Sequence, residues 1–419
     1  MNVFIWLEKY GLLLMLLFCL GVFAPDFSNK MSAVDHELDV ITNNLTKSNT
    51  FKQVFWIFVF MFFSFRFFIN TEINKLKPII TYKIFILMVI CVVALLSASW
   101  SNYPFVSMKR AMFQVLFCTS LSLGLCFAYF HKSIEFNLSG AIVICILMVI
   151  LAMIQGVGLN ESFQLAGYAK SKNTMGINLA VLIVISHMWT KSFDINSKLL
   201  NIMLVALFVL LLLTQSKTSI ALCILYLLMT RLSLFKIKVI TCSLVILFFS
   251  IFILIPGVSY HINDYQHIAL YVDDDFFTGR GIIWDALYYD LGFFDEITLG
   301  YGYGSYFGVG VIPFVLDDKY SFLQYVSSAH NGYLQLLLQF GVVGSLFIFI
   351  FFIVSMLNSN NKYLHAALII PILHNVTESS IFRDVNMAWF LMVVIIISSG
   401  IYLVRYEVSN ERDIINGNV

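Results

Sequence analysis

Long apolar runs follow one another along most of the chain, with short polar breaks between them. A helix needs about twenty apolar residues to cross the hydrocarbon core of a bilayer, and windows of that kind predict about twelve membrane spans. They lie at residues 5–24, 53–70, 79–98, 107–130, 138–156, 175–190, 199–214, 218–232, 238–256, 329–356, 364–380 and 385–404. Pro371 and His374 interrupt the span at 364–380. The pattern predicts an all-α polytopic membrane protein.

One polar interruption is much longer than the others. Between residues 257 and 328 the chain leaves the apolar pattern for roughly seventy residues, which is long for a loop with no function of its own. We therefore divide the chain into a first transmembrane bundle (1–256, about nine spans), a large loop (257–328), a second bundle (329–404, about three spans) and a tail (405–419).

The composition supports a membrane protein. The chain has 419 residues, of which 60% are hydrophobic and 12% charged, and its mean hydropathy is +0.88. Lipid is the solvent that suits so much apolar surface. A net charge of +1 gives no reason to expect a nucleic-acid partner. The seven cysteines all fall inside apolar runs, so neither a disulfide framework nor a metal-ligand spacing is indicated. The first apolar run lacks a small-residue cleavage site after it and is interpreted as a transmembrane helix rather than a cleaved signal.

Lysine and arginine placement predicts the orientation. With a cytoplasmic N-terminus, the inner loops hold about twelve basic residues and the short outer loops about six, as the positive-inside rule requires. Both termini are then cytoplasmic, and the loop at 257–328 faces outward, into the periplasm if the cell is Gram-negative.

Several basic residues fall on the outer side against this bias. They are Lys109, Arg110, Lys170, Lys172, Lys217, Arg280 and Arg383. One interpretation is that each side chain extends to the lipid headgroups by itself. The other is a shared anionic site, for which lipid-linked pyrophosphate is the obvious anion at that depth. Arg66 is a separate charge within the span at 53–70, and the sequence does not identify its partner.

The loop and the span after it contain an ordered set of short motifs. The set is Gly279-Arg280, Ile283-Trp284, Leu299-Gly300-Tyr301-Gly302, Ala329-His330-Asn331-Gly332-Tyr333-Leu334 and Gly341-Val342-Val343-Gly344. In this order the motifs resemble the O-antigen polymerase and O-antigen ligase superfamily (Wzy-like and WaaL-like). Residues 101–110, 170–176 and 214–221 are similar to further segments of that family. Lys217 stands where the family usually has arginine, so the charge is kept but the bidentate fork is not.

The resemblance implies a GT-C-like fold and a metal-independent glycosyltransferase of the bacterial inner membrane, with an undecaprenyl-pyrophosphate-linked oligosaccharide as donor and no cofactor. The residues in the Gly-Arg, Ile-Trp and Ala-His-Asn-Gly-Tyr-Leu motifs resemble polymerases more than ligases. They favour a polysaccharide polymerase, which transfers the glycan to another lipid-linked repeat unit. An O-antigen ligase, which transfers it to lipid A core, stays open, and attachment to protein is a further member class. A flippase or transporter is the competing class, although such proteins usually have matching halves and polar sites near the midplane. Besides the lipid bilayer, a chain-length regulator and a flippase are candidate partners.

Breaking the anomeric C–O bond of such a donor develops negative charge on the departing pyrophosphate, and a metal-free site needs fixed cations for it. We expect Arg280 to be the principal cation, Lys217 the second, and Lys172 and Arg110 helpers. The alternative for Arg280 is an ion pair with Asp285 or with one of the aspartates at 273–275 that only anchors the loop.

Three further positions are candidates for contact with the substrate. The resemblance places His330 near the pyrophosphate or the acceptor hydroxyl, where a neutral imidazole takes up a proton. The alternative is a helix start at which Asn331 caps backbone donors. The family often has a glutamate at the position of Glu378, which makes it a candidate base or sugar contact. A carboxylate at that depth is usually paired or functional, and Arg383 is its alternative partner.

Aromatic residues are frequent in the loop. Trp284 and Tyr333 are the two that we select as candidate sugar-stacking surfaces, and Asn331 joins them as a candidate substrate contact. The alternative is an interfacial aromatic belt, which is the usual role of such residues in a membrane protein.

Overall fold

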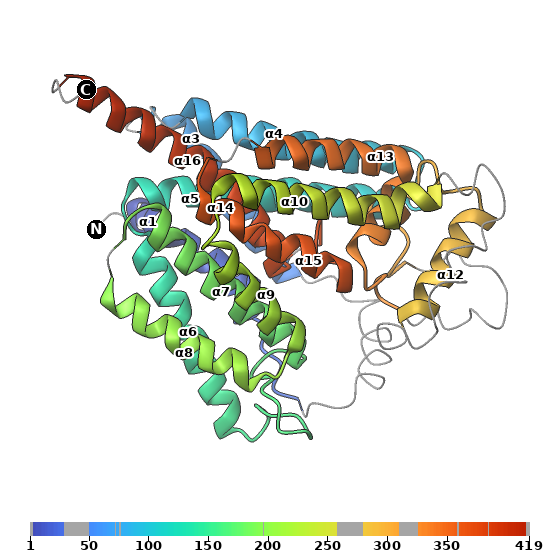
Figure 1. Cartoon of the computed structure of the whole chain (residues 1–419), viewed down its shortest axis with the longest axis horizontal. Coiled ribbons are helices and arrows are strands. Elements are labelled where there is room, and N and C mark those ends of the chain that lie inside the picture. The colour runs from blue at the N-terminus through green and yellow to red at the C-terminus, as the bar shows by residue number, and fades with distance from the viewer. Residues whose placement is uncertain are drawn as a thin grey trace.

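The computed structural model describes residues 3–28, 50–71, 73–74, 77–195, 197–257, 280–309, 326–357, 360–383 and 385–415. These residues form an all-helical bundle (Figure 1). The α-helices are α1 (Val3–Cys19), α3 (Thr50–Ile69), α4 (Lys77–Leu96), α5 (Pro104–Phe130), α6 (Ile134–Ile154), α7 (Lys172–Ser192), α8 (Lys198–Leu213), α9 (Lys217–Met229), α10 (Leu234–Phe249), α12 (Arg280–Phe293), α13 (Gly332–Leu357), α14 (Lys362–Ala367), α15 (Ile369–Thr377) and α16 (Met387–Ile415). A 3-10 turn, η1 (Ser97–Ser99), follows α4, and a π-helical turn, η2 (Ser250–Leu254), follows α10.

A helix lies at each of the twelve positions that the apolar pattern predicts. Seven of the described helical segments are at least 18 residues long and apolar enough to cross a membrane. They are Thr50–Ile69, Ile80–Ser99, Pro104–Phe130, Ile134–Ile154, Leu234–Gly257, Gly332–Ser355 and Met387–Arg405. Helices α8 and α9 are apolar but shorter. The protein is therefore a multi-pass membrane protein, with fewer long spans in the described residues than the pattern alone predicts.

The span predicted at 364–380 is built from two helices, α14 and α15. Pro371 falls in the first turn of α15, where its missing N–H group breaks no intrahelical hydrogen bond. The tail predicted at 405–419 also differs, because α16 continues to Ile415. In Figure 1 this last part of α16 projects from one end of the bundle, and α12 lies at the opposite end.

Burial separates the helices of the core from those that face lipid. Within the described chain, 83% of the central window of α16 is buried, but only 17% of that of α3. The exposed face of α3 carries large apolar side chains such as Phe58, Met61 and Phe65. Such a face is stable only against hydrocarbon, as expected for a helix at the edge of a membrane bundle.

The intramembrane charge Arg66 has a partner at the end of the bundle away from α12. Its Nε lies 2.5 Å from Oε1 of Glu8, a side chain that is 1% exposed. His131 Nε2 lies 2.8 Å from the other carboxylate oxygen of Glu8. Because a buried charge is costly unless it is paired, this three-residue contact explains how α3 tolerates an arginine.

Helix α13 is broken at Gly341, whose φ of 60° and ψ of −169° are not helical. The backbone groups that the break releases are bound by the segment after α12. The N–H of Val342 donates to the carbonyl of Ile297 (2.9 Å), and the N–H of Tyr301 donates to the carbonyl of Leu338 (2.8 Å). Irregular backbone inside a membrane bundle is stable only when its polar groups are satisfied in this way.

The sequence analysis assigns residues 257–328 to one large outward loop. In the structure, residues 280–309 of this stretch are helix α12 and a turn packed into the bundle. The turn is fixed from α12, because the hydroxyl groups of Tyr301 and Tyr306 both donate to Oδ2 of Asp290 (3.0 and 2.8 Å). Gly300 has a positive φ and lies so close to α13 that a Cβ would be 2.6 Å from the backbone nitrogen of Gly341. Two of the sequence motifs, one in the turn and one in α13, therefore form a single packed unit.

Replacing Gly341 with alanine is expected to destabilise the fold by about 3 kcal/mol or more, because its backbone region is almost reserved for glycine and the new Cβ would collide with the carbonyl of Thr298. The measurement is the thermal unfolding of the purified protein in detergent. Gly156 is the matched control: its φ is also positive but nothing lies within 4 Å of a Cβ there, so alanine costs only about 1–2 kcal/mol. Equal losses for the two variants would contradict the close packing at Gly341.

Candidate active site

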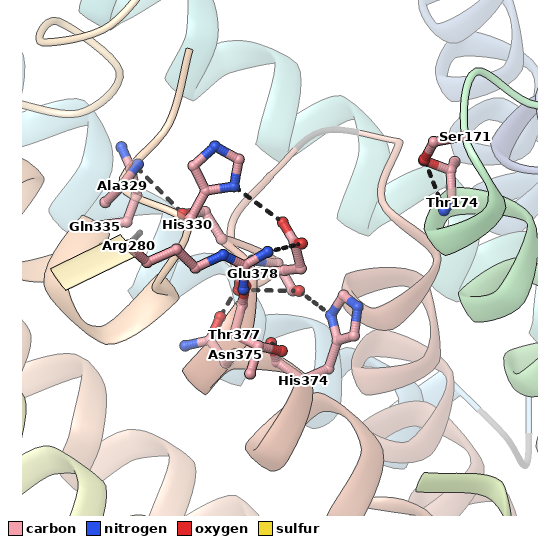
Figure 2. Close-up of polar contacts among 12 residues, drawn as sticks. Ser171, Thr174, Arg280, Ala329, His330, Gln335, His374, Asn375, Thr377 and Glu378 are labelled. Atoms are coloured by element: carbon pink, nitrogen blue, oxygen red, sulfur yellow. Dashed lines mark hydrogen bonds and ion pairs between the residues drawn. The ribbon is translucent and has the colours of Figure 1, made fainter. Parts of the chain in front are cut away.

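Arg280 and Glu378 meet at the α12 end of the bundle. Arg280 is the first residue of α12, and Glu378 follows the last residue of α15. The Nη2 of Arg280 donates to Oε1 of Glu378 at 2.7 Å, and its Nη1 donates to the carbonyl of Thr377. Figure 2 shows the two charged side chains facing each other. They are 21% and 28% exposed, so both are reachable from outside but partly shielded from solvent.

His330 joins them from a third segment. Its Nδ1 lies 3.4 Å from Oε2 of Glu378, so the two carboxylate oxygens of Glu378 face Arg280 and His330 separately (Figure 2). The backbone φ of His330 is +48°, a left-handed conformation that is uncommon for a residue other than glycine. Such strain often accompanies functional positions. We call these three side chains the Arg280–Glu378–His330 cluster.

The cluster keeps Glu378 ionised. Burial raises the pKa of this carboxyl group, but the contact with His330 and the positive charge of Arg280 outweigh that effect and lower the pKa from 4.5 to about 2. A carboxylate that holds its proton so weakly is a poor base near neutral pH. The geometry places Glu378 where it orients both Arg280 and His330, and its candidate role as a base or sugar contact stays a prediction.

The low pKa of Glu378 predicts how stability depends on pH. Because its pKa of about 2 lies below the ordinary value of 4.5, the ionised carboxylate stabilises the fold fully above about pH 4.5, and this stabilisation is lost as the pH falls toward 2. We expect Glu378→Gln to have a lower Tm than the wild type above about pH 5, and the difference to shrink as the pH falls from about 4.5 toward 2. A difference that stays the same between about pH 5 and about pH 3 would mean that the cluster does not hold the carboxylate ionised.

The structure distinguishes in part between the alternative ion-pair partners that the sequence offers for Arg280 and Glu378. The partner of Arg280 is Glu378 on another helix, and the aspartates at 273–275 lie outside the described residues. Glu378 is therefore bound by Arg280, while Arg383 is exposed.

Asn331 is fully buried and caps the start of α13. Its Oδ1 accepts hydrogen bonds from the N–H groups of Tyr333 (2.9 Å) and Leu334 (3.0 Å). This is the capping alternative, and it accounts for the acceptor atom of the side chain. We therefore assign Asn331 to positioning the helix rather than to direct contact with substrate.

The two aromatic candidates are also buried. Trp284 and Tyr333 are 5% and 4% exposed. The Nε1 of Trp284 donates to the carbonyl of Ala329 (3.0 Å), and the hydroxyl of Tyr333 donates to the carbonyl of Ile372 (3.2 Å). Tyr333 also lines an apolar pocket between α10, α13, α15 and α16. Neither ring presents an open face on which a sugar could stack, because packing against the protein covers both.

Arg110 is bound within the turn that follows α12. Its guanidinium donates to the carbonyls of Gly304, Phe307 (2.8 Å) and Gly308 (2.9 Å). The sequence analysis proposes the guanidinium of Arg110 as a helper for the pyrophosphate, but this guanidinium is bound by backbone carbonyl oxygens. We therefore revise its role to fixing the turn against α5.

The two lysine candidates begin neighbouring helices. Lys172 opens α7 and Lys217 opens α9, and the helices approach so closely at Gly176 that a Cβ there would lie 2.7 Å from Ser216. Helix α9 also packs against α15. After α9, the chain crosses the bundle through α10, through α13, and through α14 and α15 together, so the start of α9 and the end of α15 lie at the same end of the bundle. Within the described part of the chain, neither lysine is hydrogen-bonded or ion-paired to the cluster.

Lys217 begins α9, Arg280 begins α12, and His330 lies two residues before α13, all at one end of a membrane bundle. Residues 202–350 match the family model of O-antigen ligase, Wzy_C. The match confirms the resemblance to the O-antigen polymerase and ligase superfamily. No curated protein and no solved structure matches the chain.

The Wzy_C segment includes Lys217, Arg280 and His330 but ends before Glu378. The cluster is therefore completed by a residue outside the matched segment, at the end of α15. Among the described residues, no group of three or more His, Cys, Asp or Glu side chains is arranged to hold a metal ion.

The sequence analysis missed two polar residues beside the cluster. Gln335 accepts a hydrogen bond from the N–H of Ala329 (3.0 Å), and Asn375 accepts from the N–H groups of Ser380 (3.2 Å) and Ile381 (3.1 Å). Both residues interrupt apolar runs, at 333–340 and 366–376. Polar side chains within a predicted membrane helix are the signal that could have identified them.

Proposed function

We propose that the protein is a polysaccharide polymerase of the bacterial inner membrane. It transfers an undecaprenyl-pyrophosphate-linked glycan onto another lipid-linked repeat unit. The observation that carries the proposal is the meeting of Arg280, Glu378 and His330 at one end of a membrane bundle, two of them within the Wzy_C segment. A cation and an imidazole that share one carboxylate supply the two functions that this transfer needs, stabilisation of the leaving group and removal of a proton.

Arg280 is proposed to stabilise the leaving group. As the anomeric C–O bond breaks, its electron pair remains on the pyrophosphate oxygen, and a fixed cation lowers the energy of that charge. Glu378 and the carbonyl of Thr377 hold the guanidinium in place through two of its N–H groups. Arginine has five N–H donors, so donors remain for phosphate oxygens. Lys217 and Lys172, at the same end of the bundle, are proposed to add positive charge around the donor.

His330 is proposed to take the proton of the acceptor hydroxyl as that oxygen bonds to the anomeric carbon. With Nδ1 facing Glu378, the other ring nitrogen, Nε2, is the proposed site at which the proton is taken up. The carboxylate favours the tautomer with the proton on Nδ1 and stabilises the imidazolium that forms, as in other histidine–carboxylate pairs.

The finer architecture belongs to the same proposal. We propose twelve spans in a GT-C-like arrangement, cytoplasmic termini, the α12 end of the bundle in the periplasm, and no metal ion in the reaction. A chain-length regulator and a flippase are proposed partners in the membrane. The positive-inside bias of the short loops and the helix at each predicted position support this architecture.

Purified protein in nanodiscs with radiolabelled undecaprenyl-pyrophosphate-linked repeat units tests the proposal. Products of increasing length, still bound to lipid, are expected. Transfer to added lipid A core without elongation would replace the polymerase by the O-antigen ligase, the second candidate, which the Wzy_C match favours by its description. Movement of the substrate across the membrane with no covalent product would overturn both and indicate a transporter.

A further inference from the structure

The residues before and after His330 are both held by side-chain hydrogen bonds. Its φ of +48° is costly for a residue with a side chain, so it persists only where neighbouring contacts enforce it. The contacts fall on the residue before it. The N–H of Ala329 donates to Oε1 of Gln335 (3.0 Å), and the carbonyl of Ala329 accepts from Nε1 of Trp284 (3.0 Å). One residue thus has both backbone groups bound by side chains of two different helices.

The residue after the strained position is fixed as well. Asn331 caps α13, so the direction of the chain beyond His330 is set by the helix. Gly332 packs directly on Asn375, leaving no room for a Cβ. The same Asn375 holds the N–H groups of Ser380 and Ile381, immediately after Glu378. The turn that carries the imidazole and the turn that carries the carboxylate are therefore built against each other.

From this arrangement we infer that Gln335 and Trp284 are positioning residues, which hold Ala329 and thereby aim His330 at Glu378. Figure 2 shows Gln335 beside Ala329, and His330 facing Glu378. The inference rests on the proposed function, since it assigns these residues to the base of that reaction. It replaces the sugar-stacking role that the sequence suggests for Trp284. Trp284 acts through the backbone of Ala329, and Gln335 acts through that backbone and also accepts from the hydroxyl of Ser379 (3.5 Å), the residue after Glu378.

Gln335 provides a discriminating pair of substitutions. Gln335→Leu keeps the approximate size and removes the acceptor oxygen, whereas Gln335→Glu keeps an oxygen that accepts from the N–H of Ala329. Misplacing a catalytic group by about 1 Å costs on the order of 10²-fold in rate. We expect kcat for glycan transfer to fall by about 10- to 100-fold in Gln335→Leu with KM unchanged, and to stay within about threefold of the wild type in Gln335→Glu.

A double-mutant cycle separates positioning from a general structural role. If Gln335 acts through His330, Gln335→Leu has no further effect once His330 is alanine. A second readout needs no activity: hydrogen exchange at the amide of Ala329, followed by mass spectrometry, is expected to be about fivefold faster in Gln335→Leu and unchanged in Gln335→Glu.

The results of these experiments test the positioning role of Gln335 and Trp284 separately from the proposed function. Additive losses in the cycle, unchanged exchange at Ala329 or a fully active Gln335→Leu variant would overturn it. If Gln335→Leu does not fold, Trp284→Phe takes its place, because it keeps a ring and loses only the donor to Ala329; wild-type kcat in that variant would equally overturn it. A fully active His330→Ala variant would instead refute the proposed base, and the exchange measurement would still decide whether Gln335 holds the turn.

Discussion

Replacing Arg280 with alanine is expected to reduce glycan transfer by about 10³-fold while membrane insertion stays intact. Removal of one group that stabilises developing negative charge typically costs about 10²–10³-fold in kcat, and Arg280 is proposed to be the principal cation for the pyrophosphate. The measurement is the rate at which radiolabelled lipid-linked repeat units are joined by the purified variant, with thermal unfolding as the check of its fold.

The chain offers a matched control for this substitution. Arg405 also pairs with a carboxylate, that of Asp194 at 3.1 Å, but both side chains are exposed and lie at the other end of the bundle. Arg405→Ala therefore removes the same group and an ion pair without touching the site, and an exposed pair of this kind contributes little to stability. Wild-type transfer by Arg280→Ala, or an equal loss in the two variants, would contradict the role of Arg280.

Substitution with lysine refines the same test. Arg280→Lys keeps the charge and loses the fork that binds Glu378 and a phosphate at the same time. An activity between those of the wild type and Arg280→Ala is expected. Lys217 occupies a position where the family usually has arginine, and its proposed role of adding positive charge around the donor needs only a point charge, because Arg280 is proposed to supply the fork.

The positions of the helices could be predicted from the sequence because apolar length is a local property. Arg280 and His330 could be selected because their motifs are also local. Their shared partner could not be identified, since Glu378 lies 98 residues from Arg280 and is brought there only by the return of α15 to the same end of the bundle. No local pattern records such a contact.

Arg110 illustrates the opposite error. Its charge and predicted level are the same as those of Arg280, yet it binds carbonyls in a turn 194 residues away. Likewise, Trp284 lies in the predicted loop and Tyr333 near the start of the span predicted at 329–356, but both rings are buried by the packing of α12 and α13. Residue type and depth indicate which groups can contact a substrate; the tertiary contacts determine whether they are free to do so.

His330→Ala is the second substitution with a large expected effect. General-base catalysis contributes about 10²–10⁴-fold, so we expect kcat to fall by about 10³-fold with little change in KM. Added imidazole should restore part of the rate, because it can enter the space of the missing ring and accept the same proton. The measurement is kcat as a function of imidazole concentration.

The control for this variant is another histidine bound to a glutamate. His131 lies 2.8 Å from Glu8 at the far end of the bundle, and Glu8 keeps Arg66 as a partner when His131 is replaced. His131→Ala should therefore retain transfer, and imidazole should not change its rate. A rise in KM without loss of kcat in His330→Ala would show that the histidine binds substrate rather than taking its proton.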